Sequence, residues 1–161
     1  MNAVTERPHP PLVGMVAAVD PGRSKCGLVL ADCSHGEIKD ALVVLADDTL
    51  TQLERWHQQT PLTALVLGDG TSSKAWQQQL QHLAPMRIVK EAGTTLRARE
   101  RYWQIWPAQG WRRLLPQGLR LPPSELDGIA ALVLLEDQLH QPLTWLHPPK
   151  QGPGLRTVPA R

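Results

Sequence analysis

Short continuous runs of hydrophobic residues mark the first third of the chain. Residues 13–19, 27–31 and 38–45 each have the length and apolar character of a strand. The first run ends at Asp20-Pro21-Gly22, a turn signal. Because the connections between the runs are short, we predict three strands joined as an antiparallel meander.

Helical and strand-like segments alternate after this meander. A helix is predicted at 50–58, a buried strand at 62–67, a helix from Thr71 or Ser72 to Leu83, a short strand at 86–89, and a helix from Thr94 or Thr95 to Trp106. A run of strands followed by alternating units indicates an α/β fold. We therefore expect a mixed five-stranded sheet, three antiparallel strands and then two parallel ones, flanked by helices.

The last predicted helix has the clearest pattern. Apolar residues recur at helical spacing from Leu126 to Leu135, and Ser124 is in position to cap the N-terminus. Such an apolar helix is expected to be largely buried. A loop at 107–123 precedes it and is longer than a compact domain usually carries without a reason.

The chain of 161 residues has the length of one domain. Residues 1–11 carry three prolines and no periodicity, and residues 147–161 are basic and rich in Pro and Gly. We expect a disordered N-terminus at 1–11, one domain at 12–146, and a flexible tail at 147–161.

Charge and cysteine content indicate which partners and which cellular compartment to expect. Net charge is only +2, but nine Lys or Arg residues and only two acids lie between Lys74 and Arg120. Such a basic stretch is either a solvated helix face or a surface for phosphate backbones. The two cysteines match no metal-ligand spacing, which favours a reduced, cytoplasmic protein. We expect neither export nor a membrane partner, because no signal core or membrane-spanning run is visible.

Three acidic residues stand at predicted element ends. Asp20 ends the first strand, Glu91 follows the last short strand, and Asp127 lies in the first turn of the last helix. Such carboxylates can meet at one edge of a sheet, where they would repel one another unless a divalent ion neutralised them. Mg²⁺, or Mn²⁺ in its place, suits oxygen ligands and supports phosphodiester hydrolysis.

Each acid also has a purely structural explanation. Asp20 suits a turn, Glu91 suits an exposed position before a glycine, and Asp127 suits the positive end of a helix dipole. Only their joint placement favours a metal site. A fourth acid, Asp69, is better explained as a turn residue between Gly68 and Gly70.

Four segments, in order along 13–139, resemble the YqgF-like family of Holliday junction resolvase-like and pre-16S ribosomal RNA processing nucleases. The opening segment is AVDPGRSKCGLVLAD, where Asp20, Gly22, Lys25 and Gly27 match the family pattern. The others are LVLGDGTSSKAWQQQL at 65–80, KEAGTT at 90–95 and DGIAA at 127–131. The resemblance implies a ribonuclease H-like fold, with Asp20, Glu91 and Asp127 as metal-binding catalytic residues.

The resemblance also implies a nucleic-acid substrate, either branched DNA such as a Holliday junction or a structured RNA such as a ribosomal RNA precursor. Three features depart from the family: its Asp-Glu-Arg is Lys90-Glu91-Ala92 here, the basic pair after the first Asp is reduced to Ser24-Lys25, and the loop at 107–123 is additional. Trp103 and Trp106 are better explained as core residues. Candidate contacts to nucleic acid are Lys25, Lys74, Lys90, Arg97, Arg112, Arg113 and, for base stacking, Trp111.

Two other functions remain open at this point. A non-catalytic nucleic-acid-binding protein of the same fold would bind substrate without cutting it. The departures from the family pattern at Lys90 and Ala92 are compatible with that alternative. An ATP-binding protein of the actin-like superfamily also opens with Asp-x-Gly after an apolar strand. That class needs a second lobe, for which the chain is short. The expected protein is a monomer or a homodimer.

Overall fold

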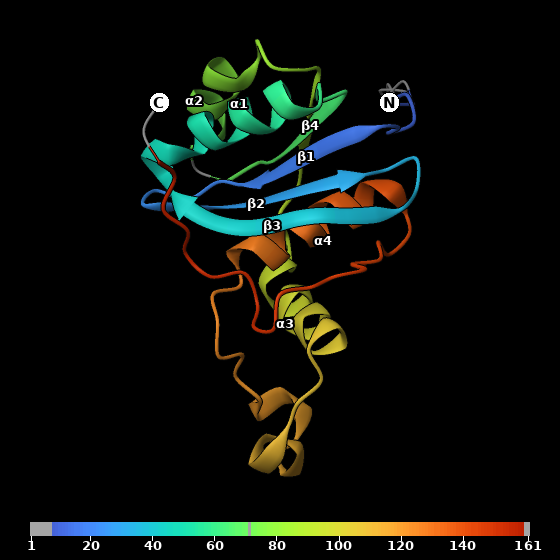
Figure 1. Cartoon of the computed structure of the whole chain (residues 1–161), viewed down its shortest axis with the longest axis vertical. Helices are drawn as coiled ribbons and strands as arrows, with labels where there is room; N and C mark the ends of the chain where they lie inside the picture. The colour runs from blue at the N-terminus through green and yellow to red at the C-terminus, as the bar shows by residue number, and fades with distance from the viewer. Residues whose placement is uncertain (1–7, 71, 160–161) are drawn as a thin grey trace, which may run out of the picture.

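A five-stranded mixed sheet organises the molecule. The computed structural model describes residues 8–70 and 72–159 and shows an open sheet with helices on both faces (Figure 1). The first three strands pair antiparallel, and the last two join β1 in parallel, in the order β3-β2-β1-β4-β5. This arrangement confirms the predicted fold class. The strands are β1 (Met15–Asp20), β2 (Lys25–Asp32), β3 (Glu37–Leu45), β4 (Ala64–Gly68) and β5 (Met86–Val89).

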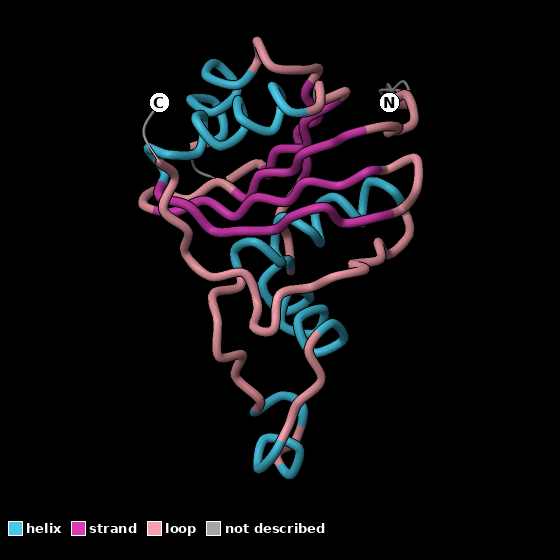
Figure 2. Tube along the Cα trace, viewed as in Figure 1, coloured by secondary structure: helices cyan, strands magenta, loops and turns pink. Residues whose placement is uncertain are grey.

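Two pairs of helices cover the sheet. Figure 2 shows one pair on each side of the strands. One pair is α1 (Thr49–Gln59), which follows the short η1 (Ala46–Asp48), and α2 (Ser73–Leu80); the other is α3 (Thr94–Ile105) and α4 (Asp127–Leu139). Helix α2 ends earlier than the predicted Leu83, and Thr71, one of its two predicted first residues, lies outside the described residues.

Alternating side chains give the sheet two hydrophobic cores. In β1, Val16 and Ala18 join the core beneath α3 and α4, whereas Ala17 and Val19 join the core beneath α1 and α2. Residues of the central strands are therefore buried on both faces, as their continuous apolar runs predict. The same alternation directs Asp20, two residues after Ala18, to the α4 face.

Helix α4 lies across the middle of its face of the sheet. Its residues from Gly128 to Leu135 are all buried, which confirms the prediction of a largely buried helix. Ser124 as its N-cap is wrong: the N-cap residue is Leu126, and no side chain caps the helix. The helix begins at Asp127, directly after Leu126, where the chain reaches β2. Ser124 instead lies against Gly152 of the C-terminal tail.

Residues 107–123 project away from the body of the molecule, below α3 in Figure 1. They contain two short 3₁₀ turns, η2 (Gly110–Leu114) and η3 (Gln117–Leu119), and expose large apolar side chains, among them Trp111 at 65% and Leu114 at 87%. Helix α3 supports this projecting segment from above. Trp103 donates a hydrogen bond to the Arg120 carbonyl (3.2 Å) and packs with Trp106 against the core, as predicted for both tryptophans.

The structure describes most of the C-terminal tail but not the first seven residues. Residues 1–7 lie outside the described residues, so the predicted disorder at 1–11 stays a prediction. The tail lies along the edge strand β3, where Arg156 donates its backbone N–H to the Val43 carbonyl (2.7 Å), and Val158 is buried. None of the helices within 8–70 and 72–159 has the length and apolar character needed to cross a bilayer.

Replacing Gly27 by Ala tests how α4 is seated on the sheet. A Cβ at Gly27 would lie 1.8 Å from the Asp127 carbonyl oxygen, so α4 must shift. Overpacking of this kind costs about 1–3 kcal/mol, and the melting temperature should fall by several degrees. Gly118→Ala is the matched control, because a Cβ there meets nothing within 4 Å. An unchanged melting temperature for Gly27→Ala would show that α4 is not held by this contact.

Candidate functional site

Asp20 is the last residue of the central strand β1, at the edge of the sheet where the chain turns toward β2. Its neighbours across the two strand pairs are small. In the antiparallel pair it lies opposite Gly27 of β2, and in the parallel pair the preceding residue, Val19, lies opposite Leu67, so Gly68 follows beside Asp20. A glycine therefore flanks the carboxyl group on each side.

Gly27 leaves space for the start of helix α4. The hypothetical Cβ of residue 27 would overlap both the carbonyl group of Asp127 and the backbone nitrogen of Gly128 (2.7 Å). Glycine at this position thus allows the helix backbone to touch the sheet directly beside Asp20. The contact brings Asp127 to the same edge, as the sequence predicts for a first-turn residue of a buried helix.

Gly68 and Gly70 leave space for the carboxylate of Glu91. A Cβ at Gly68 would lie 2.0 Å from Glu91 Oε1, and one at Gly70 would lie 3.0 Å from Oε2. The backbone of Glu91 is held from both sides. Its N–H donates to Asp69 Oδ1 (3.1 Å), and its carbonyl accepts from the backbone N–H of Thr94 (3.1 Å). The Glu91 side chain therefore folds back over the end of β4, toward Asp20.

The Asp20 carboxyl group is perturbed by both of the other acids. Burial raises the pKa of Asp20 to about 8, and Glu91 adds to the rise by charge repulsion and by accepting a hydrogen bond from the protonated acid; repulsion from Asp127 adds further. Burial also raises the pKa of Glu91 and that of Asp127. Asp20 thus interacts electrostatically with both Glu91, in the turn after β5, and Asp127, at the start of α4, and these three acids are the coupled group of this site.

When Asp20 is ionised and cannot donate, the buried Glu91 Oε1 has no hydrogen-bond partner among the described residues. A buried carboxylate oxygen without a donor is costly, and a cation is one way to satisfy it. The donor set, three carboxylates, suits Mg²⁺ or Mn²⁺. Within 8–70 and 72–159, no cluster of three or more His, Cys, Asp or Glu side chains has the convergence of a metal centre as the side chains stand. The chemistry of the residues fits a divalent ion, and its binding stays a prediction.

Lys25 is the predicted phosphate contact closest to the carboxylates. It lies in β2 and donates to Glu125 Oε1 (2.5 Å), and its charge lowers the pKa of Asp127. The second oxygen of Glu125 is buried without a hydrogen-bond partner in the described chain. Lys25 is therefore at the site, with its charge already paired by an acid that precedes α4.

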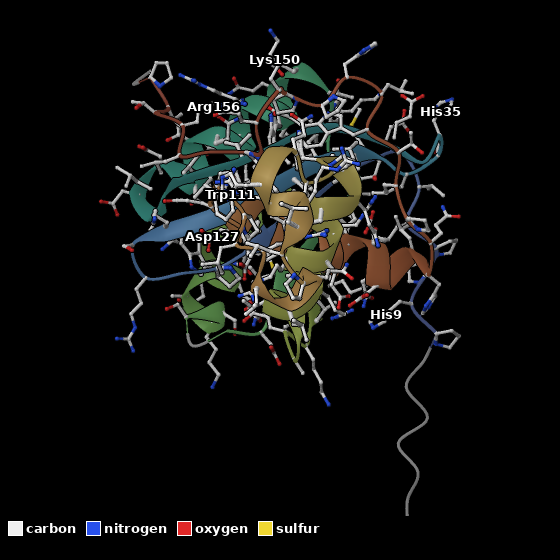
Figure 3. The ribbon with its side chains drawn as sticks, turned by 90° about the horizontal axis from the view of Figure 1, so that it is seen from below. His9, His35, Trp111, Asp127, Lys150 and Arg156 are labelled. Carbon is white, nitrogen blue, oxygen red and sulfur yellow. The ribbon has the colours of Figure 1, made fainter. Side chains whose placement is uncertain are left out.

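The other residues predicted to contact nucleic acid differ in their surroundings. Arg97 donates to both carboxylate oxygens of Asp137 (2.6 Å each) and so joins α3 to α4. Lys74, Lys90 and Arg113 are exposed. Arg112 lies over the ring of Trp111, 5.2 Å from its centroid, in the projecting segment. Figure 3, viewed from below, shows Trp111 on this segment and Asp127 on the body of the molecule. No described contact tests any of these residues against nucleic acid.

Some residues that shape the site were not predicted as part of it. Asp69 does lie in the Gly68–Gly70 turn, but its side chain also fixes the backbone of Glu91. Glu125 pairs with Lys25 across a hundred residues, a contact without a local sequence signal. The glycines at 27 and 68 were visible as parts of motifs, but their role as space for Asp127 and Glu91 required the structure.

No protein-family model matches the chain, and a search of curated proteins gives no match either. The assignment of a function therefore depends on the residues and geometry of the site.

The raised pKa of Asp20 makes the metal-free protein sensitive to pH. Native Asp20 keeps its proton up to about pH 8, whereas the unfolded chain releases it near the ordinary value of 3.8. The unfolded state then binds fewer protons, so this group lowers stability as pH rises between these values. In EDTA, Asp20→Asn should melt higher than the wild type at pH 8, by about 2–4 °C for each 1 kcal/mol relieved, and the difference should shrink toward pH 4.

The exposed Asp47 provides the control, because its replacement by Asn removes an acid outside the coupled group. If Asp20→Asn melts at or below the wild-type temperature at pH 8, Asp20 is not repelled by its neighbours.

Proposed function

We propose that this protein is a divalent-metal-dependent endonuclease that hydrolyses phosphodiester bonds in structured nucleic acid. The observation that carries the proposal is that Asp20, Glu91 and Asp127 lie at one edge of the sheet, where the other two acids raise the pKa of Asp20. Three acids brought together against their mutual repulsion are difficult to explain as turn and helix-end residues alone. The mixed sheet with α4 across it supports the ribonuclease H-like assignment that the YqgF-like resemblance implies.

The chain supplies binding and positioning. Asp20, Glu91 and Asp127 would hold the ion, and the unpartnered Glu91 Oε1 is available for it. When bound, such an ion activates a water molecule and stabilises the leaving oxygen. Asp69 fixes the backbone from which the Glu91 side chain extends. Lys25 would hold a substrate phosphate by exchanging its contact with Glu125 for one with a phosphate oxygen.

A cleavage panel tests the proposal. Labelled four-way DNA junctions, duplex DNA and hairpin RNAs are incubated with Mg²⁺, Mn²⁺ or EDTA. The wild type should cut at least one structured substrate only with metal. Asp20→Asn, Glu91→Gln and Asp127→Asn should each lower the rate more than about 100-fold, the scale of losing one positioned catalytic group. Binding should persist, because phosphate affinity comes from Lys and Arg.

Asp47→Asn, which changes an exposed acid outside the coupled group, should cut at the wild-type rate. Binding of these substrates without cleavage under any metal condition would support the non-catalytic alternative and contradict the proposal. Cleavage by Asp20→Asn at the wild-type rate would show that the catalytic residues lie elsewhere.

A further inference from the structure

A cavity of about 240 Å³ lies where the projecting segment meets the body of the molecule. Trp103 and Trp106 of the α3 region form part of its wall, with Arg112 from the projecting segment and Lys150 from the tail. For comparison, cavities of about 150 Å³ hold a benzene molecule. The cavity is therefore large enough for a flat aromatic ring system, and it is separate from the carboxylate group.

The two tryptophans are fixed in place by the protein. Trp106 Nε1 donates to the Pro149 carbonyl (2.7 Å), and Trp103 Nε1 donates to the Arg120 carbonyl (3.2 Å). Tyr102 packs against both rings, with centroid distances of 4.9 and 5.0 Å. Because both indole N–H groups are already bonded, the rings can offer a ligand stacking surface but no hydrogen bond. Such a surface accepts any base.

The charge of the cavity favours a phosphate-bearing ligand. Its lining contains Arg112 and Lys150 but no acidic residue. An adjoining cavity, which shares Trp103, contains the acid Glu100 and suits a nucleotide less well. Stacking surfaces beside unopposed cations are the combination that proteins use to hold unpaired nucleotides.

One wall of the cavity lies close to Asp127 along the chain. Its wall includes Pro123, which is four residues before Asp127. Four residues span at most about 14 Å. At about 3.4 Å per stacked nucleotide, this distance corresponds to about four nucleotides or fewer.

We propose that this cavity, between Trp103, Trp106, Arg112 and Lys150, binds an unpaired base and its phosphate, so that the substrate carries unpaired nucleotides within about four of the bond that is cut. The base stacks on one of the two indole rings and meets the other edge-on, because the Trp103 and Trp106 rings lie at 90° and 34° to the Tyr102 ring and are not parallel. The two cations contact the phosphate. The distance to the cut rests on the proposed function; the binding of an unpaired nucleotide does not. Branched, flapped or single-stranded nucleic acid fits this requirement, whereas uninterrupted duplex leaves the cavity empty.

Binding in EDTA tests the inference without cleavage. Fluorescence anisotropy is measured for a labelled oligothymidylate and for a duplex of equal length. Trp106→Leu and Trp103→Leu should each weaken oligothymidylate binding about 5- to 150-fold, from 1–3 kcal/mol per stacked base, with little effect on duplex. Trp106→Phe should retain most of the affinity, because an aromatic face remains. Trp76→Leu, in the opposite core, is the control for a lost tryptophan that should not affect single strands selectively.

Variants of the two cations test the same site without changing a core residue. Lys150→Gln and Arg112→Gln should each flatten the log–log salt dependence of oligothymidylate binding by about 0.7, the value for one lost phosphate contact on single strands. Lys39→Gln removes a lysine that is paired with Glu37 on β3 and should leave the slope unchanged. Equal losses for duplex and single strand in the tryptophan variants, or an unchanged slope in Lys150→Gln and Arg112→Gln, would overturn the inference. Selective binding of single strands together with a negative cleavage panel would refute the nuclease and leave this site standing.

Discussion

The direct contact between the start of helix α4 and Gly27 of strand β2 is the constraint on which the rest of the site depends. The contact brings the backbone of Asp127 onto the sheet opposite Asp20, and only glycine leaves room for it. The apolar residues of α4 hold the helix there against β1 and β2. The hydrophobic core therefore positions a carboxylate that, by charge alone, would move away from its neighbours.

Packing and backbone hydrogen bonds hold the three acids together, whereas burial and charge repulsion disfavour their ionised forms. Burial and repulsion together raise the pKa of Asp20 to about 8, so this carboxyl group keeps its proton at neutral pH. Two hydrogen bonds hold the backbone of Glu91 in place despite this repulsion. Its N–H donates to Asp69, and its carbonyl accepts from the N–H of Thr94. Strain of this kind at a sheet edge is typical of binding and catalytic sites, where stability elsewhere offsets it.

Local patterns predicted the elements better than their contacts. The apolar runs of β1 to β5 and the spacing in α4 follow directly from side-chain burial, so strands, helices and the acids at their ends were visible in the sequence. Contacts between distant residues were not. The pairing of Arg97 with Asp137, the pairing of Glu125 with Lys25, and the contact of the tail with β3 were not predicted. These pairings depend on how α3, α4 and the tail pack, which no local pattern encodes.

We propose that the space beside Asp20 allows the Glu91 carboxylate and Asp127 to share a divalent ion. Calorimetric titration of metal-free protein with Mn²⁺ tests it most directly, comparing the wild type with Gly68→Ala, whose Cβ would displace the end of the flexible Glu91 side chain. Gly118→Ala serves as the control. We expect Mn²⁺ binding by the wild type and the control, and its loss in Gly68→Ala at a nearly unchanged melting temperature. Absence of Mn²⁺ binding by the wild type, or equal binding by Gly68→Ala, would contradict the proposal.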